Sequence, residues 1–515
     1  DMTLTSITSS RSSDGYDLAD IDFDGAAMIT PRTTNTNLDA VSQEFRLASN
    51  NNEKVNWLVG AYYYQEDLAY DADVIWGPMW RPLMDIFTAQ QTGGLASLAG
   101  VGAIFNVPSS QILQAGTGSI VSGTQDTETT TFFAQVDINL TDKLSAILGA
   151  SYIEDDKKAT LSELNTDVFS QLDFVGAGTL QYIQAGFPPA TAAALAGDPA
   201  TNPLLLFQGL QFLNQLVAIP NAAESGQSLD DNVDYTAKLT YLINDNVSIY
   251  GGVATGFKSS AWNLTGNSLP STSEIAALAA AGTPVPPNTS PGQRYARPES
   301  AEVFELGMKM RLPSGYLNIT AFKQEIEDFQ SNVFVSSGFI LANAGLQSSE
   351  GFEFDLLLSP VPSIDITFGG LVMDSNYDSF VGADTSSGAD MSGTKPENVH
   401  DKSFTSAITY NWSQGQTEGY VRLNHLYSGP TWIRLDPADN DVMCAAGFCQ
   451  KTKDTLNFSA GITMGNLDII LYGNNINDDE YLTSTFPEVG DPLASSFNGY
   501  PNAPKTYGIT FNYSF

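Results

Sequence analysis

The chain has 515 residues, and its 22 Lys and Arg against 58 Asp and Glu give a formal net charge of −36. This balance argues against nucleic acid as a partner, because phosphate binding needs clustered Lys and Arg. Only 16% of the residues are charged and 11% are aromatic, a composition that excludes a disordered acidic chain. The two histidines, His400 and His425, are too few for a His-rich metal site. No apolar run reaches the roughly 18 residues of a membrane-spanning helix.

Apolar and polar residues alternate with a period of two, which is typical of β-strands. We count sixteen such segments of roughly ten residues each, the first at 2–12 and the last at 503–515. The last segment shows the pattern best, since its aromatic and apolar residues share one face: Tyr507, Ile509, Phe511, Tyr513 and Phe515. An apolar outer face with aromatic ends is typical of membrane barrels, although a soluble β-sandwich produces the same alternation.

The lengths of the connections separate these two architectures. Seven connections are short turns, among them Thr141-Asp142, Asn244-Asp245 and Pro313-Ser314, and the eight alternate ones are long. Sandwich connections are mostly short, whereas an outer-membrane barrel alternates short periplasmic turns with long extracellular loops. The sequence therefore predicts an all-β fold. We expect a transmembrane antiparallel up-and-down β-barrel of about 16 strands, with Phe515 on the periplasmic side.

Five segments carry a resemblance to a known family, and they occur in the order of that family. They are Ser42–Ser49 followed by Trp57–Tyr64; Tyr250–Asn263; Pro298-Glu299 followed by Glu305–Lys309; Asn343–Gly345 followed by Gly351–Asp355; and Asn475–Asp478 followed by Tyr481, Pro504 and Tyr507–Phe515. They resemble the barrel of TonB-dependent receptors, the active transporters of Gram-negative outer membranes. One departure lies in the second segment, where Ser260 and Ala261 occupy the stretch in which the family carries glycines.

The resemblance implies an architecture larger than this chain. The family barrel has 22 strands, and an N-terminal plug domain and a TonB-contacting segment precede it. We therefore expect residues 1–515 to be the β-barrel portion, with the plug and about six strands absent from this sequence. The implied partners are outer-membrane lipid, the plug domain, the TonB complex and the barrel-assembly machinery. The alternate aromatics Tyr507, Phe511, Tyr513 and the terminal Phe515 resemble the signal that this machinery reads.

The resemblance also implies transport rather than covalent chemistry. Substrates of the family are ferric siderophores, cobalamin, haem and some oligosaccharides, and a ferric siderophore is our first expectation. Motifs of hydrolases, P-loop enzymes and zinc proteases are absent from the sequence, so we do not expect an enzyme. A passive 16-strand porin remains an alternative, because sixteen strands is also the porin count.

Aromatic and cationic residues in the long loops are candidates for substrate contact. They are Trp76, Trp80, Arg81, Trp262, Trp432 and Arg434. An Arg beside a Trp can bind an anionic, ring-bearing ligand such as a ferric siderophore. The alternative is that these residues anchor the barrel rim in the lipid headgroup region.

Two other loop motifs suggest bound or cross-linked loops. Asp20, Asp22 and Asp24, followed by Gly25, match the start of a calcium-binding loop, although Pro31 stands where an EF-hand needs Glu. The sequence thus leaves two alternatives, a Ca²⁺ site in an extracellular loop or a strand top with alternate carboxylates. Cys444 and Cys449 predict a small disulfide loop in an oxidising compartment, with free thiols or a metal as alternatives.

The segment Pro203–Ile219 has apolar residues at helical spacing, at Leu206, Leu210, Leu213 and Val217. Such a stripe more often packs a loop together than binds a partner. We expect a helix that packs its own loop. The alternative is a receptor or structural barrel whose large loops hold a partner protein, docked on this segment.

Overall fold

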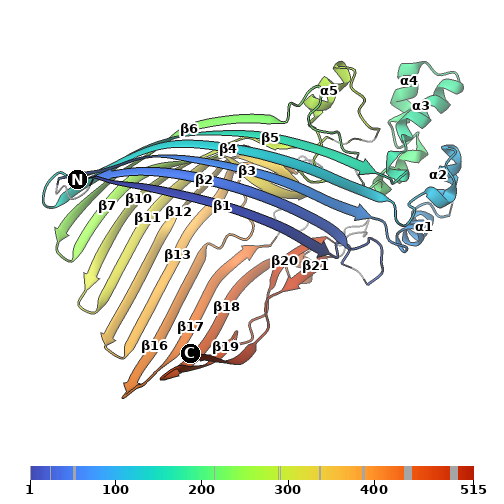
Figure 1. Cartoon of the computed structure of the whole chain (residues 1–515). Helices are drawn as coiled ribbons and strands as arrows, with labels where there is room; N and C mark the ends of the chain where they lie inside the picture. The colour runs from blue at the N-terminus through green and yellow to red at the C-terminus, as the bar shows by residue number, and fades with distance from the viewer. Residues whose placement is uncertain are drawn as a thin grey trace.

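The structure is a computed structural model, and it describes residues 2–23, 25–49, 54–94, 96–213, 215–287, 289, 291–335, 338–384, 389–433, 443–487 and 497–515. Most of these residues lie in β-strands, and sixteen strands form one antiparallel sheet (Figure 1). The sheet strands, in spatial order, are β1 (Met2–Ala19), β2 (Arg32–Ser49), β3 (Val55–Ile75), β4 (Gly118–Asn139), β5 (Leu144–Asn165), β6 (Gln227–Asn244), β7 (Val247–Lys258), β10 (Glu299–Leu312), β11 (Gly315–Val335), β12 (Gly338–Val361), β13 (Ile364–Ser379), β16 (Lys402–Gln414), β17 (Thr417–Trp432), β18 (Gln450–Met464), β19 (Leu467–Asn474) and β22 (Thr506–Tyr513). Each strand pairs with its neighbours along the chain, so the predicted up-and-down order of sixteen strands is confirmed.

The two edges of this sheet are the first and last strands. Within the described residues, β1 pairs with β2 alone and β22 pairs with β19 alone. Membership of this sheet in a 22-strand barrel stays a prediction.

Short turns join the strands at one end of the sheet, as the sequence predicts. Two-residue links connect β6 to β7, β10 to β11, β12 to β13, β16 to β17 and β18 to β19. Gly415 and Gly465 begin two of these turns with φ of +66° and +61°, a backbone conformation that glycine adopts without strain. The predicted turn at residues 50–53 lies outside the described residues.

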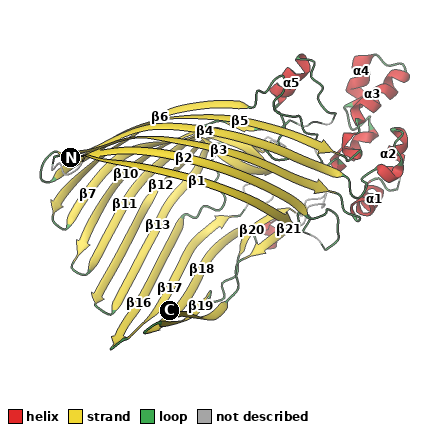
Figure 2. Ribbon diagram, in the orientation of Figure 1, coloured by secondary structure: helices red, strands yellow, loops and turns green. Residues whose placement is uncertain are grey.

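The long connections leave from the other end of the strands and carry the helices (Figure 2). The helices are α1 (Trp80–Gln91), α2 (Leu98–Ile104), α3 (Phe174–Gln184), α4 (Pro189–Ala196) and α5 (Thr272–Ala280), with 3-10 turns η1 (Ser109–Gln111), η2 (Phe169–Gln171) and η3 (Pro203–Leu210). Three two-stranded hairpins also belong to these connections: β8 (Ala261–Trp262) with β9 (Tyr295–Ala296), β14 (Val381–Asp384) with β15 (Ala389–Asp390), and β20 (Leu482–Pro487) with β21 (Phe497–Pro501). None of the described helices has the length and apolar content needed to cross a membrane.

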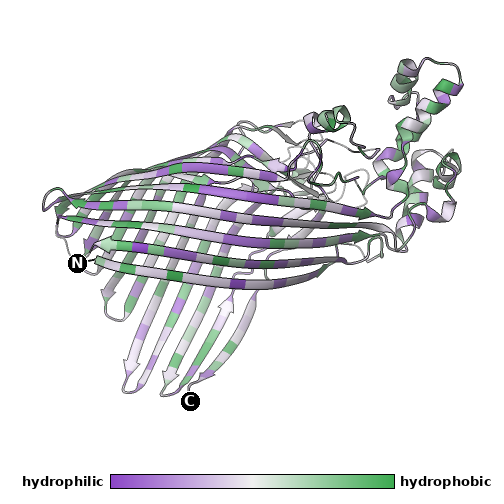
Figure 3. Ribbon diagram, turned by 45° about the horizontal axis from the view of Figure 1, so that its top comes forward, coloured by the Kyte–Doolittle hydropathy of each residue, from purple (hydrophilic) through white to green (hydrophobic). Residues whose placement is uncertain are grey.

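Hydrophobic and hydrophilic residues alternate along strands of the sheet (Figure 3). Successive side chains of a strand point to opposite faces, so the sheet has a more apolar face and a more polar one. On β22, Tyr507, Ile509, Phe511 and Tyr513 are between 55% and 67% exposed. On β10, Leu306 is 65% exposed. The polar face lies on the inside of the curve, since one pocket collects side chains from β2, β3, β4, β5, β7 and β11. An apolar exterior and a polar interior are the arrangement of a membrane barrel.

Three of the long connections pack together into a helical subdomain, which we call the loop lobe. Its buried core joins residues of 28–29, 76–113 and 169–210, which belong to the β1–β2, β3–β4 and β5–β6 connections. The segment Pro203–Ile219 contributes to this core through Leu210, and Leu213 packs against it. The expectation that this segment packs its own loop is confirmed for these residues, whereas Leu206 of the same stripe is 65% exposed. The helical part is the 3-10 turn η3 rather than a longer helix.

Aromatic rings on the polar face cover glycines of neighbouring strands. Tyr250 of β7 pairs directly with Gly307 of β10, and its hydroxyl lies 2.9 Å from Thr320 Oγ1 of β11. A Cβ on Gly307 would lie 2.4 Å from the Tyr250 ring. A ring over a cross-strand glycine replaces the packing that the glycine cannot supply.

We therefore expect Gly307→Val to displace Tyr250 and to destabilise the barrel by roughly 1–3 kcal/mol, the usual cost of overpacking. Urea unfolding of the refolded barrel, followed by heat-modifiable gel mobility, measures this change. Gly256→Ala on β7 is the matched control, because a Cβ there meets its nearest atom only at 3.9 Å. Equal stability of the two variants would contradict the packing role of Tyr250.

Candidate functional site

The candidate site is a pocket of about 480 Å³ on the polar face, at the end of the sheet that carries the long connections. Its wall residues come from six strands of the sheet, and its roof comes from the start of the β7–β10 connection. The lining consists of Thr36, Leu68, Tyr70, Gln125, Lys157, Lys258, Ser259, Ser260, Ala261, Trp262, Leu264, Thr265 and Gln330. Of the residues predicted to contact substrate, Trp262 lies in this pocket.

The roof is attached to the wall by a network of polar contacts around Ser259 and Ser260. Lys157 Nζ donates to Ser259 Oγ at 2.5 Å and to the Ser260 carbonyl at 2.8 Å. Ser260 is 1% exposed, and its backbone N–H and hydroxyl donate to Asp230 Oδ2 at 3.0 and 2.5 Å. Gln330 of β11 donates to the Ser259 carbonyl at 2.8 Å. These contacts fix the chain where it leaves β7.

Trp262 forms the aromatic part of the roof. Its Nε1 donates to Ser228 Oγ at 3.2 Å, and its ring lies 5.1 Å from the ring of Tyr295, its partner in the β8–β9 hairpin. The indole is therefore held by contacts to β6 and to β9. Trp262 is only partly buried.

Two lysines, Lys157 and Lys258, line the pocket, and a third cation, Arg32, contacts a lining residue. Lys157 Nζ lies 2.8 Å from Asp155 Oδ1, and these side chains are 11% and 8% exposed. Lys258 is 59% exposed and lies 3.8 Å from Glu299, so solvent screens this pair. Arg32 donates to the hydroxyl of the lining residue Tyr70 at 2.7 Å. Cations beside aromatic rings can bind an anionic ligand that carries rings.

Comparison with known proteins identifies the architecture that holds this pocket. The sequence profile described as "TonB dependent receptor-like, beta-barrel" matches residues 3–476. The chain belongs to this family of TonB-dependent receptors. A search of curated protein sequences finds no match. The family is one of receptors and transporters rather than enzymes.

Solved structures share the receptor fold at low sequence identity. The ferric yersiniabactin uptake receptor FyuA of Yersinia pestis is 15% identical with a TM-score of 0.64, and the match covers 100% of this chain and 58% of that one. The siderophore receptor PiuA of Acinetobacter baumannii is 16% identical with a TM-score of 0.57, covering 99% and 62%. The ferric-catecholate import receptor Fiu of E. coli K12 is 15% identical with a TM-score of 0.56, covering 100% and 62%. This receptor chain thus spans about six-tenths of the length of these structures.

The receptor-like strand end at Tyr250–Asn263 supplies the pocket roof, and its departure from the family pattern has a structural explanation. Ser260 and Ala261 occupy the stretch where the family carries glycines. The Ser260 hydroxyl hydrogen-bonds Asp230 and Ser228 on β6, so this receptor anchors its roof through a side chain that glycine lacks.

Two of the predicted tryptophans have a packing role in the receptor. Trp76 and Trp80 are each 1% exposed in the core of the loop lobe, and their rings stack at 4.5 Å with an interplanar angle of 5°. Arg81 bonds Asp85 and the carbonyls of Ser109 and Ile112, which ties α1 to η1. The lobe core encloses Trp76 and Trp80, and Arg81 links two of its elements. Substrate contact by these three residues stays a prediction.

The remaining predicted contacts lie away from the pocket or outside the described residues. Trp432 ends β17, where it pairs with Gln450, and it does not line the pocket. Arg434 lies outside the described residues. Sequence reasoning missed Lys157, Tyr70 and Arg32, although each is a polar residue at an inward position of a strand.

The acidic loop after β1 is closed by backbone contacts. Asp22 is 2% exposed and its Oδ2 accepts from the Ile29 N–H at 2.6 Å, while Asp20 Oδ1 accepts from the Phe23 N–H at 3.3 Å. Asp24 lies outside the described residues. Across the described part of the chain, no three His, Cys, Asp or Glu side chains are grouped as metal ligands. A Ca²⁺ site here stays a prediction.

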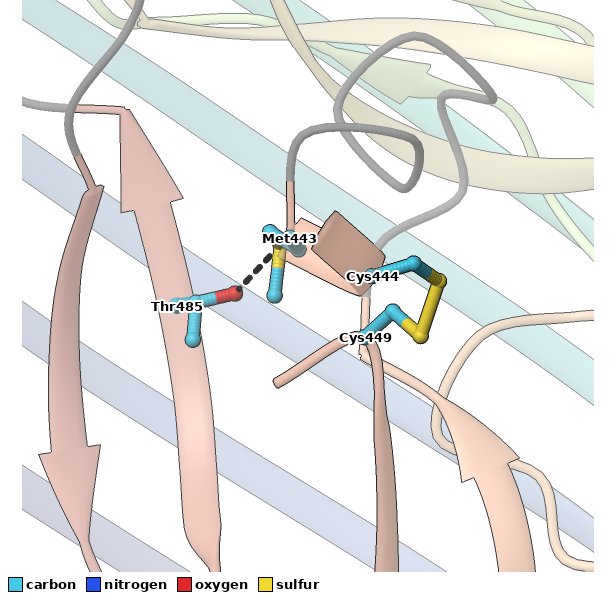
Figure 4. Close-up of a disulfide and its surroundings, with 4 residues drawn as sticks. All are labelled: Met443, Cys444, Cys449 and Thr485. Atoms are coloured by element: carbon cyan, nitrogen blue, oxygen red, sulfur yellow. Dashed lines mark hydrogen bonds between the residues drawn. A yellow bond between two sulfur atoms is a disulfide. The ribbon is translucent and has the colours of Figure 1, made fainter. Parts of the chain in front are cut away.

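Cys444 and Cys449 form the predicted disulfide, in the connection between β17 and β18 (Figure 4). The adjacent Met443 is 2% exposed, and its Sδ accepts from the hydroxyl of Thr485 in β20 at 3.4 Å. The cross-linked turn therefore packs against the β20–β21 hairpin of the next long connection.

We expect the Cys444→Ser/Cys449→Ser variant to lose about 2 kcal/mol of local stability, the chain-entropy value for so short a loop. Hydrogen exchange should then speed up in residues 443–450 and in β20, because Met443 is no longer held against Thr485. Reduction of the native receptor should reproduce the effect, and the same reductant should leave the serine variant unchanged. Unaltered exchange in both segments would contradict this packing role.

Proposed function

We propose that this chain is the barrel portion of an outer-membrane active transporter that imports a ferric siderophore. Membership of the TonB-dependent receptor family supports the transport class, and an apolar exterior supports location in the outer membrane. The single observation that carries the substrate class is the pocket that places Lys157 and Lys258 beside the indole of Trp262.

The chemistry of the pocket favours an anionic ligand with rings. The chain has a net charge of −36, yet two lysines, Lys157 and Lys258, line this one pocket. Positively charged side chains at a binding site attract anionic ligands. Many ferric chelates combine negative charge with aromatic ligand groups, which Lys157, Lys258 and Trp262 can contact together. The solved neighbours named for ferric yersiniabactin, siderophores and ferric catecholates support the same class.

An energised transporter of this kind needs several partners. Import against a gradient needs the inner-membrane TonB complex, and a plug domain would close the barrel and complete the substrate site with the loops. The barrel-assembly machinery would insert the chain into outer-membrane lipid by reading β22 and the residues after it. Tyr507, Phe511 and Tyr513 of β22 and the following Phe515 have exposed side chains.

Uptake of radioactive iron from a panel of ferric siderophores, in cells that express the full-length receptor, tests this function. We expect uptake of at least one anionic siderophore in cells with TonB and none in cells that lack TonB. TonB-independent flux together with a large steady conductance in planar bilayers would instead establish the porin alternative. If no siderophore of the panel is taken up, even when it binds, the result would favour a receptor whose loops hold a partner protein.

A further inference from the structure

A buried ion pair joins two different long connections above the pocket. Arg294 belongs to the β7–β10 connection and Glu224 to the β5–β6 connection, and Arg294 Nη1 lies 3.3 Å from Glu224 Oε2. Their side chains are 0% and 4% exposed. Long loops rarely bury a full charge, because the desolvation of each ion is costly.

Glu224 is fixed to the barrel wall. Its backbone N–H donates to Asn221 Oδ1 at 2.8 Å, and Asn221 donates to the carboxylate at 2.5 Å. The segment around it is hydrogen-bonded to β5, through paired contacts between Leu161 and Ile219 and through Ala159 with Gly226. The carboxylate therefore presents a fixed anion at the top of β5.

Arg294 belongs to the part of the roof that carries Trp262. The carbonyl of Arg294 accepts from the Asn263 N–H at 2.7 Å, and the next residue, Tyr295, pairs with Trp262 in the β8–β9 hairpin. A movement of Arg294 away from Glu224 would thus move the strand that faces Trp262.

The guanidinium depends on Glu224 to an unusual degree. Within the described residues, Nε, Nη1 and Nη2 of Arg294 are buried without a hydrogen-bond partner. Burial lowers the pKa of Arg294, and Glu224 and Glu274 are the charges that oppose this shift. Burial likewise raises the pKa of Glu224, against the effects of Asn221 and Arg294. Removing one partner would leave the other charge buried without its ion-pair partner, whereas replacing both by apolar side chains would not.

We propose that the Glu224–Arg294 pair is a latch that holds the β8–β9 hairpin against the barrel wall and so positions Trp262 over the pocket. Arg294 is a positioning residue, because it acts through Trp262 and does not line the pocket. The importance of this position for import rests on the proposed function. The latch itself does not, since it can be measured without substrate.

Acrylamide quenching of Trp262 fluorescence in the full-length receptor tests the latch. Each variant is made with and without Trp262→Phe, so that the difference isolates one indole among the six tryptophans of the chain. Arg294→Met and Glu224→Leu should each raise the quenching constant of Trp262 roughly threefold or more, since each leaves one buried charge unpaired. The double variant Glu224→Leu/Arg294→Met should return it to the native value.

Two outcomes would overturn the proposal: unchanged quenching in both single variants, or a double variant as strongly quenched as the single ones. Heat-modifiable gel mobility verifies that each barrel is folded. If Arg294→Met does not assemble, Glu224→Gln replaces it in the comparison, because this substitution keeps the side-chain shape and removes the charge. If the double variant regains the native quenching constant but the native receptor takes up no ferric siderophore, the latch is upheld and the proposed function is rejected.

Discussion

Trp80→Ala is expected to open the loop lobe and to leave the barrel folded. Trp80 is 1% exposed, stacks on Trp76 and contacts the edge of the Phe212 ring at 5.1 Å. Removal of a buried tryptophan side chain costs about 3–5 kcal/mol, and the lobe has only its own three connections to absorb that loss. Limited proteolysis should therefore cut residues 76–117 and 166–226 faster, while the barrel keeps its heat-modifiable mobility.

Met79→Ala is the matched control for this prediction. Met79 precedes Trp80 in the chain but is 45% exposed, so its truncation removes little buried area. Equal protease sensitivity of the Trp80→Ala and native receptors would contradict a packing role for this tryptophan.

The sequence predicts the sheet well because its two signals are local. Alternation along a strand and the length of a connection require no knowledge of distant contacts. The strand lengths were harder to predict. The predicted strand 128–140 is observed as Gly118–Asn139, since the added residues, such as Thr124 and Asp126, are polar on both faces and lack the apolar alternation of a membrane segment.

The site was predicted less well, because burial in loops depends on contacts between connections. Trp76 and Trp262 look equivalent in sequence, yet one is enclosed by a lobe built from three loops and the other faces a pocket. The sequence does contain a local signal that the tryptophans of the lobe are buried. Trp80, Met84 and Thr88 recur every four residues and are all buried on one side of α1, the spacing of a helix that packs.

The wall residues of the pocket could have been found from strand register. Lys157 alternates with its neighbours so that it shares the polar face with Asp155, whereas Lys158 lies on the opposite face with Asp156. Lys157 is only 11% exposed, and a lysine buried to this degree needs an acidic partner or a ligand. That partner could not be identified before the register was known.

Lys157→Met should weaken binding of an anionic ferric siderophore by roughly 30-fold or more, because truncating one member of a buried charge pair costs about 2–5 kcal/mol. Three effects add in this direction. The ligand loses a cation in the pocket, and Asp155, only 8% exposed, is left as an uncompensated anion next to it. The roof also loses two anchors, since Lys157 donates to Ser259 and Ser260. Quenching of tryptophan fluorescence by ferric siderophores measures the affinity.

Lys158→Met is the matched control, because Lys158 is the next residue along β5, is 55% exposed and lies 3.9 Å from its nearest carboxylate. It should bind the ligand as the native receptor does, since an exposed pair contributes little. Lys157→Arg, which keeps the charge, should retain more affinity than Lys157→Met. If Lys157→Met and Lys158→Met bind equally well, charge in this pocket does not select the ligand. The anionic class would then be rejected while transport by the family mechanism stays open to test.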